Sequence, residues 1–344
     1  MALELESEIH KIAPTIFFAH TYSGTCISGT KSFKSPIVTP CHRRFGWKCM
    51  LHYYPHRCGG WSPLTMVNLF RLQSKHLENL NRYTALITHS DSMKTEFINN
   101  GLNPERIYNL LYTTQHNAEV FGAGRDANLA LYNERGPFSQ DKMRSIESDS
   151  LSGDRTKPCW RLLFIGRMEL LKGGHIFLDA LPEVMSAVNR HVYVTFAGDG
   201  PKRREWKRKA DLIADGQKLK IEFTGWVDKA RLANLLKDCH LLVVPSLWPE
   251  PFGLVGPEAG TYGVPAAAFD VGGIPEWLKD GVNGFLAPGD PPTAAGLASA
   301  IIKCLSNPNT HAGLCHGAIE VARNFRMEIH VGNILNIFHK ILAG

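Results

Sequence analysis

The chain has 344 residues, enough for two domains of ordinary size; 44% of them are hydrophobic and 20% are charged. This balance excludes a disordered chain, and no apolar run approaches the roughly 18–20 residues that a membrane-spanning helix needs. The formal net charge of +6 favours anionic partners, among which nucleotides, phosphorylated glycans, acidic lipids and nucleic acid remain open.

The first part of the chain combines short buried strands with helices. Apolar runs and helical spacing predict strands at residues 15–19, 36–39, 85–89 and 107–111, and helices over 63–83 and 93–100. The run Ser90-Asp91-Ser92 is predicted to cap the second helix. His20 and His42 follow the first two strands. Because parallel sheets bind ligands outside the carboxyl ends of their strands, both histidines are site candidates.

Periodicity fails between about residues 117 and 158. A structureless segment of this length is unusual inside a compact domain, so we place a domain boundary there. The predicted organisation is a first domain over 1–120, a linker over 121–158, a second domain over 159–326 and a final helix over 327–344.

The second part of the chain alternates strands and helices regularly. Strands are predicted at 160–165, 192–197, 219–223, 240–244, 264–269 and 284–287, with helices at 176–188, from 202, and at 232–237, 292–305, 310–324 and 327–342. This alternation predicts an α/β fold with doubly wound parallel sheets. Ile334, Ile337, Phe338 and Ile341 share one face of the final helix, which we expect to pack back across a cleft toward the first domain.

The stretch from 245 to 258 follows a buried strand and contains two carboxylates, Glu250 and Glu258. Between them, Phe252-Gly253-Leu254-Val255 predicts a turn that opens a helix. A helix N-terminus favours an anion such as a phosphate, and carboxylates accept hydrogen bonds from sugar hydroxyls. The stretch therefore indicates a nucleotide-sugar site; an ordinary strand–loop–helix connection with two solvated acids is the alternative.

A basic turn follows the first strand of the second domain. Arg167 offers a fixed fork of donors and Lys172 a compact charge, and they lie five residues apart. Together they could grip a diphosphate. The alternative is a basic turn on a solvated edge.

Five motifs occur in one order in the second domain. They are Gly166-Arg167 with Lys172-Gly173, Ala197-Gly198-Asp199-Gly200-Pro201, Phe223-Thr224-Gly225-Trp226-Val227, Pro245-Ser246 with Glu250 and Glu258-Ala259, and Gly272-Gly273-Ile274-Pro275-Glu276. In this order they resemble the donor-binding domain of glycosyltransferase family 4, whose members are retaining enzymes of the GT-B fold with two Rossmann-like domains. The resemblance covers about residues 159–340.

The resemblance implies a donor site. Its residues are Gly166, Arg167, Lys172, Gly198, Val227, Glu250, Phe252, Gly253, Leu254, Val255 and Glu258. Arg167 and Lys172 would bind the diphosphate and stabilise the leaving nucleotide, and Glu258 would bind the ribose hydroxyls. Glu250 would hold the donor sugar, while Val227 would lie near the base. The implied catalytic residues are Glu250, Arg167, Lys172 and, on the acceptor side, His20.

The resemblance also bears on cofactors and donors. No cofactor and no metal are expected, because Arg, Lys and a helix end supply the electrostatics that a metal supplies in other transferases. The donor would be a UDP-, GDP- or ADP-sugar, and the acceptor a glycan or a lipid-linked glycan.

The first domain resembles the family more weakly, through residues 17–20, 37–42 and 88–90. His20 is the preferred acceptor-side residue and His42 the alternative. The non-functional interpretation is that His20 is a histidine at a strand end whose ring nitrogens are hydrogen-bonded within the protein. Family members begin with further βα units and a Gly-rich loop, so we expect this first domain to be incomplete. Either the sequence begins late, or a partner chain or second copy completes the sheet, which would otherwise keep an open edge, or the protein binds donor with little turnover.

Two further clusters leave alternatives open. A tetrahedral zinc site could be formed by Cys26, Cys41, Cys49 and Cys58. The alternative is that these are reduced cysteines in a loop-rich region. The basic run over 202–209 could bind an anionic membrane surface; the alternative is that it is only a solvated helix face.

Three functions remain in view. The first is a metal-independent retaining glycosyltransferase, the second a non-catalytic nucleotide-sugar-binding subunit, and the third another GT-B enzyme such as an epimerase or phosphorylase. No nucleic-acid partner is expected. Sparse cysteines and an acidic N-terminus without a secretory signal predict a cytoplasmic protein, peripheral to the inner face of a membrane if the basic run binds lipid.

Overall fold

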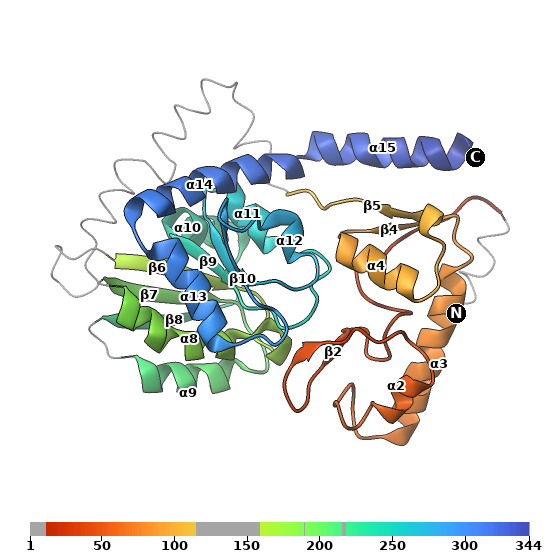
Figure 1. Ribbon diagram of the computed structural model, residues 1–344, viewed down its shortest axis with the longest axis horizontal. Helices are drawn as coiled ribbons and strands as arrows, with labels where there is room; N and C mark the ends of the chain where they lie inside the picture. Colours follow the sequence, from red (N-terminus) through yellow and green to blue (C-terminus); the bar gives the residue numbers. More distant parts are fainter. Residues whose placement is uncertain (1–11, 115–158, 189, 215–217, 344) are drawn as a thin grey trace.

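The computed structural model describes residues 12–114, 159–188, 190–214 and 218–343. Figure 1 shows two α/β lobes side by side, each built on its own parallel sheet. The predicted α/β fold with parallel sheets is therefore confirmed. The predicted linker over 121–158 and the first eleven residues lie outside the described residues, and the domain boundaries stay predictions.

The first lobe contains a three-stranded parallel sheet in the order β1–β4–β5 within the described residues. Its elements are β1 (Ile16–Phe18), α2 (Lys48–Leu51), α3 (Pro63–Leu80), β4 (Ala85–Thr88), α4 (Asp91–Asn99), the 3-10 helix η1 (Pro104–Arg106) and β5 (Ile107–Asn109). The Ser90 hydroxyl accepts the N–H of Met93 at 3.2 Å, so the first of the three predicted capping residues is the cap, and α4 begins at Asp91 rather than at Met93. Met93 and Phe97 of α4 are fully buried and anchor the helix in the core of the lobe.

The predicted strand at residues 36–39 is wrong. The chain there forms a two-stranded antiparallel hairpin, β2 (Ser32–Phe33) with β3 (Thr39–Pro40), which lies outside the parallel sheet. The two prolines in the segment have no N–H to donate to a ladder, and Ile37 is 61% exposed. Val38 instead packs into the core of the second lobe.

The second lobe has a six-stranded parallel sheet in the order β11–β10–β9–β6–β7–β8. The strands are β6 (Cys159–Ile165), β7 (His191–Ala197), β8 (Leu219–Gly225), β9 (Leu241–Val244), β10 (Ala266–Phe269) and β11 (Gly284–Ala287). The chain first adds strands on one side of β6 and then returns to add β9 on the other. The carboxyl ends of β6 and β9 therefore form a topological switch point, the usual ligand-binding place in such sheets.

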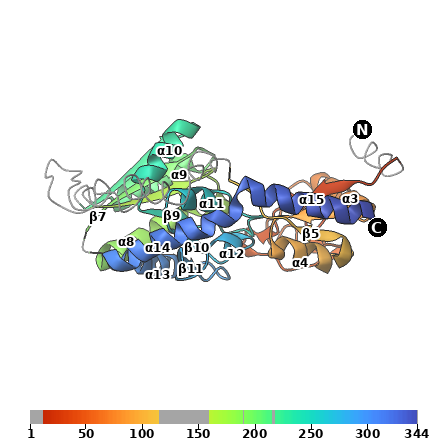
Figure 2. The ribbon, with the colours of Figure 1, turned by 90° about the horizontal axis from the view of Figure 1, so that it is seen from above.

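Helices cover both faces of the second sheet, with α8 and α13 on one side and α10 on the other (Figure 2). The helical elements are η2 (Leu170–Lys172), α8 (Gly174–Ala187), α9 (Arg203–Ile213), α10 (Lys229–Asp238), α11 (Val255–Thr261), α12 (Ile274–Trp277), α13 (Ala294–Leu305), α14 (Pro308–Ala322) and η3 (Arg323–Phe325). Strands β9 and β10 are buried throughout, as expected for central strands of a covered parallel sheet.

The final helix, α15 (Met327–Ala343), leaves the second lobe and lies along the first (Figures 1 and 2). Ile337 joins a buried cluster with Ile87 and Leu110, two residues of the first lobe. Ile334, Phe338 and Ile341 pack against the same cluster. One apolar face of α15 thus ties the C-terminal part of the chain to the first sheet.

Half of the six basic residues in the run at 202–209 form ion pairs within the lobe. Lys202 lies 2.5 Å from Glu205, and Lys209 lies 2.6 Å from Asp179. Trp206, in the middle of the run, is buried. The remaining basic side chains of the run are exposed or half-buried, and binding to an anionic membrane stays a prediction.

All eight cysteines lie within the described residues, and none of them forms a disulfide there. Within that same part of the chain, none of the helices has the length and apolar character that crossing a membrane requires.

Replacing Ile337 by Ala should lower the free energy of unfolding by about 2–4 kcal/mol, because it removes buried methyl groups and leaves a cavity under α15. Urea denaturation followed by circular dichroism measures this. Leu335→Ala is the matched control, since Leu335 is 49% exposed on the same helix, and should change stability by less than about 0.5 kcal/mol. Equal effects of the two variants would show that α15 does not dock.

Candidate functional site

The loops after β6 and β9 touch each other at the switch point. The Leu247 N–H donates to the Leu171 carbonyl at 2.8 Å. Gly173 adopts φ +66, and a Cβ built on it would lie 1.7 Å from the Pro245 carbonyl oxygen. Only glycine fits this position, because it permits the positive φ and leaves room for the neighbouring backbone. This close approach places Lys172 beside the loop that contains Glu250.

Lys172 and Glu250 form an ion pair at the centre of these loops. The lysine Nζ lies 2.5 Å from Glu250 Oε1, and the Ser246 hydroxyl donates to the same oxygen at 2.6 Å. Glu250 is only 5% exposed, so its charge requires such partners. Lys172 Nζ also lies 5.6 Å from the centre of the Trp248 ring. Among the described residues, the hydrogen bonds to this carboxylate go to Oε1, which leaves Oε2 available to a ligand hydroxyl.

The Gly272-Gly273 turn holds the backbone of Glu250. Gly272 has φ +58, and a Cβ on it would lie 2.4 Å from both the N and O atoms of Glu250. The Gly273 N–H donates to the Glu250 carbonyl at 2.7 Å. A side chain at position 272 would therefore displace the carboxylate from the ion pair.

The predicted turn and helix after Glu250 are present. The Phe252 carbonyl accepts the indole N–H of Trp277 at 2.8 Å, and Gly253 has φ +91. Helix α11 then begins at Val255, with Glu258 half-buried in its first turn. The Trp277 side chain thus packs against this turn and is hydrogen-bonded to its first residue, Phe252.

The remaining predicted donor residues lie at the same edge of the sheet. Gly198, after β7, packs so closely on Gly166, after β6, that a Cβ would meet the Gly166 carbonyl oxygen at 2.1 Å. The Arg167 side chain is 69% exposed and lies 3.9 Å from Glu169. Val227, after β8, packs against the core of the lobe. Arg167 is therefore held less firmly than Lys172.

His20 follows β1 and is exposed at the carboxyl edge of the first sheet. Its Nδ1 hydrogen-bonds to the Tyr112 hydroxyl. The His20 ring stacks on His89 with centroids 5.1 Å apart, and His89 stacks on Tyr112 at 3.7 Å. Tyr112 meets Phe252 edge-on at 5.6 Å. An aromatic stack thus connects the predicted acceptor-side histidine to the donor-side turn.

His89 is a buried, neutral member of this stack. Its Nδ1 lies 2.8 Å from the Leu110 carbonyl, which can only accept, so Nδ1 bears the proton. Its Nε2 is buried with no hydrogen-bond partner in the described part of the chain. Burial, which is the main cause, lowers the pKa of His89 from 6.5 to about 4.

A cavity of about 280 Å³ lies between the lobes and is lined by residues of both. Its walls include His42 and Glu96 from the first lobe and Pro249, Gly272 and Asp290 from the second. His42 Nε2 lies 3.5 Å from the Asp290 carboxylate, so this histidine reaches across the cavity rather than to the donor loops. Pro249 precedes Glu250 in the chain and Gly272 packs on its backbone, so the cavity borders the Glu250 loop, while Glu250, Lys172, Arg167 and His20 themselves do not line it.

The two lobes also meet beside this cavity. The Glu276 carboxylate accepts the N–H of Asp91 at 2.6 Å, at the start of α4. A Cβ on Gly273 would lie 2.9 Å from Cβ of Ser90, the cap of α4. The Gly-rich motif of the second lobe therefore contacts both Glu250 and the first lobe.

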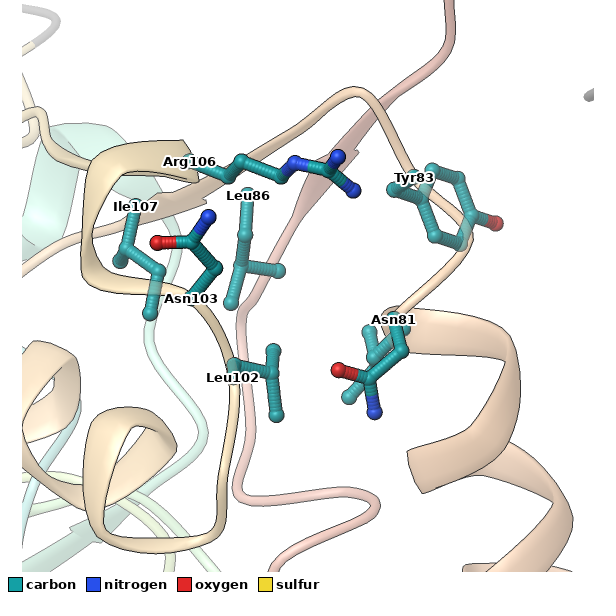
Figure 3. A pocket seen from close by; sticks show the side chains of 8 residues that line it. Asn81, Tyr83, Leu86, Leu102, Asn103, Arg106 and Ile107 are labelled. Atoms are coloured by element: carbon teal, nitrogen blue, oxygen red, sulfur yellow. The ribbon is translucent and has the colours of Figure 1, made fainter.

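A second hollow lies within the first lobe, between α3 and the sheet (Figure 3). Its volume of about 20 Å³ is enough for roughly one water molecule, and its walls include Leu86, Leu102 and Ile107. It is too small for a sugar or nucleotide.

The four cysteines of the zinc alternative do not come together as a metal site. Among the described residues, no group of three or more His, Cys, Asp or Glu side chains could hold a metal ion. Burial instead raises the pKa of the Cys41, Cys49 and Cys58 thiols, which favours the neutral thiol.

Ser246, Trp248, His89 and Tyr112 are parts of the site that the sequence analysis did not assign. Ser246 stands two residues beyond β9, and His89 directly follows β4, as His20 follows β1. Their position at the carboxyl ends of strands is a signal that could have indicated Ser246 and His89. Tyr112 and Trp248 are recognisable only from the packing of the two lobes.

Comparison with known proteins shows what the second lobe is similar to. Residues 160–307 match the family model described as "Glycosyl transferases group 1". A glycogen synthase of Mycobacterium tuberculosis is 35% identical over 159 residues, 45% of this chain and 36% of that protein. A phosphatidyl-myo-inositol mannosyltransferase of Mycobacterium leprae is 29% identical over 182 residues, 52% of this chain and 46% of that protein. The matched part is thus less than half of the length of either relative.

The described chain is also similar in fold to a solved structure. The crystal structure of Anabaena Alr3699/HepE in complex with UDP and glucose aligns with a TM-score of 0.62, over 100% of this chain and 76% of that one, at 21% identity. The second lobe is therefore similar in sequence to group 1 glycosyltransferases, and the described chain has the GT-B fold. Family 4, retention and an incomplete first domain stay predictions, as do the roles of the individual site residues.

The neutral state of His89 predicts a pH-dependent stability. Because its pKa in the folded protein, about 4, lies below the ordinary 6.5, the unfolded chain binds the proton first as the pH falls. The stabilisation is complete above pH 6.5, and roughly 3 kcal/mol of it should be lost between pH 7 and pH 4.

Urea denaturation of the wild type and of His89→Gln across this pH range isolates that contribution. The difference in unfolding free energy between the two proteins should shrink as the pH falls. Parallel curves would contradict a buried neutral histidine.

Proposed function

We propose that this protein is a metal-independent retaining glycosyltransferase that moves a sugar from a nucleotide-sugar to an acceptor hydroxyl. The observation that supports this best is the Lys172–Glu250 ion pair, which lies at a topological switch point and whose Glu250 loop borders an interlobe cavity. The similarity of residues 160–307 to group 1 glycosyltransferases supports the same function. HepE, which shares the fold, was crystallised with UDP and glucose.

On the donor side, Lys172 would contact the diphosphate and stabilise the charge that develops on the leaving nucleotide. Its pairing with Glu250 holds the ammonium in place before the donor binds, so little reorganisation is needed. Arg167, which is exposed, would close on the same diphosphate when the donor is present. Glu258, in the first turn of α11, would accept hydrogen bonds from the ribose hydroxyls.

Glu250 would act through its free oxygen. Oε1 is used by Lys172 and Ser246, so Oε2 is the atom that can accept a hydroxyl of the donor sugar. The carboxylate would thus orient the sugar while its buried charge remains compensated.

On the acceptor side, His20 would contact the reacting sugar, and Tyr112 would position it. Burial raises the pKa of Tyr112 to about 12, so the phenol is protonated and can donate to Nδ1 of a neutral imidazole. Nε2 of His20 would then bear the proton and could donate to a sugar oxygen.

Glu258→Ala should weaken UDP binding by roughly ten- to one hundredfold, because a charged hydrogen-bond acceptor for the ribose is lost. Isothermal titration with UDP measures the change, and Glu183→Ala on α8 serves as an exposed carboxylate control. Unchanged affinity of Glu258→Ala would refute this placement of the ribose.

Lys172→Gln combined with Glu250→Gln should lower sugar transfer at least about one hundredfold, since the cation facing the leaving group is removed. The double variant keeps the buried site neutral and hydrogen-bonded, whereas Lys172→Gln alone leaves Glu250 unpaired and should lose about 2–3 kcal/mol of stability. Release of UDP from UDP-sugars, with and without added acceptors, provides the assay.

Lys237→Gln, on the exposed side of α10, is the control and should retain activity. A double variant with wild-type transfer would contradict the proposed role of the pair. A folded wild-type protein that binds UDP but neither hydrolyses nor transfers sugar from any of the UDP-sugars tested would instead indicate a binding subunit.

A further inference from the structure

The chemistry of the interlobe cavity indicates what kind of acceptor it takes, and this inference rests on the proposed function. The cavity volume of about 280 Å³ is near the lower end of the roughly 300–1,000 Å³ of small-molecule sites. It can therefore hold a group of about the size of one sugar ring. Pro249 and Gly272 place that group beside the Glu250 loop.

The first-lobe wall offers neutral hydrogen-bonding groups. Ser92, Thr95 and Asn99 are exposed and line it with two hydroxyls and an amide. Tyr22, in the same wall, is buried, and burial is the main cause of its raised pKa, so the phenol stays protonated and adds no charge. Groups of this kind donate to and accept from sugar hydroxyls.

The one lysine of the cavity wall is already neutralised. Lys31 is 2% exposed, and its Nζ lies 2.6 Å from Glu96 Oε1 and donates to the Arg43 carbonyl. A phosphate could use this ammonium only by breaking a buried ion pair, which is strongly unfavourable.

The second-lobe wall adds negative charge. Asp270 and Asp290 both line the cavity and are exposed to it and to solvent. Asp290 has His42 at 3.5 Å, and no ion pair of Asp270 is present within the described residues. A phosphate or carboxylate that entered the cavity would therefore meet two carboxylates and no free lysine or arginine of the wall.

We propose that the cavity accepts an uncharged, hydroxyl-rich acceptor, such as the neutral terminal sugar of a glycan, and selects against an acceptor that places a phosphate there. The carboxylates of Asp270 and Asp290 produce this selectivity, and Ser92 and Thr95 provide hydroxyl contacts. A lipid-linked acceptor satisfies the proposal if its phosphate stays outside the cavity.

Saturation-transfer NMR on the full chain saturated with UDP tests the proposal, with methyl α-D-glucopyranoside and its 6-phosphate as matched probes. At low ionic strength the neutral probe should bind at least about tenfold more tightly, and added salt should reduce the ratio. Asp270→Asn with Asp290→Asn should bring the ratio to within about threefold, whereas Asp238→Asn, on exposed α10, should leave it unchanged.

Preference for the phosphate probe, no binding of the neutral probe, or an unchanged ratio in the double variant would each overturn the proposal. A thermal shift with UDP, measured on the same samples, separates this result from the donor site. If UDP shifts the melting temperature but the probes show no selectivity, the acceptor inference fails alone. If UDP produces no shift, the donor site fails, and the two probes are compared on the chain without UDP.

Discussion

The buried carboxylate of Glu250 imposes the constraint on which the site depends. A charge that is 5% exposed is stable only with a counter-ion and further hydrogen bonds, and Lys172 and Ser246 supply them. These partners come from loops far apart in sequence, after β6 and after β9. The strand order makes those loops neighbours, and glycines at 173 and 272 let the backbones approach closely enough for the pair to form.

The same constraint couples the two lobes. The Gly272-Gly273 turn that grips the Glu250 backbone also contacts Ser90, and Glu276, three residues later, binds the start of α4. On the other side of the site, Tyr112 connects His20 to Phe252. A change of position between the lobes would therefore alter the donor loops, the acceptor-side histidine and the cavity together.

Most of the elements were predictable because their periodicity is strong. The strand leading to Glu250 is four consecutive buried apolar residues, and the cap of α4 is a serine in the expected place. The apolar composition of residues 36–39 predicted a strand of the parallel sheet, and this prediction was wrong. Val38 is buried against the other lobe rather than against neighbouring strands, and Ile37 faces solvent. The burial of this segment therefore depends on the packing of the two lobes and not on a local strand.

The sequence by itself determined the α/β class, the order of the motifs and the residue types of the proposed donor site, since local spacing and composition encode them. The tertiary structure alone decided that Lys172 pairs with Glu250, that Tyr112 holds His20, and that His42 faces Asp290 across a cavity. These contacts join residues 78, 92 and 248 positions apart, respectively. Such contacts depend on strand order and lobe packing, which no local pattern of residues specifies.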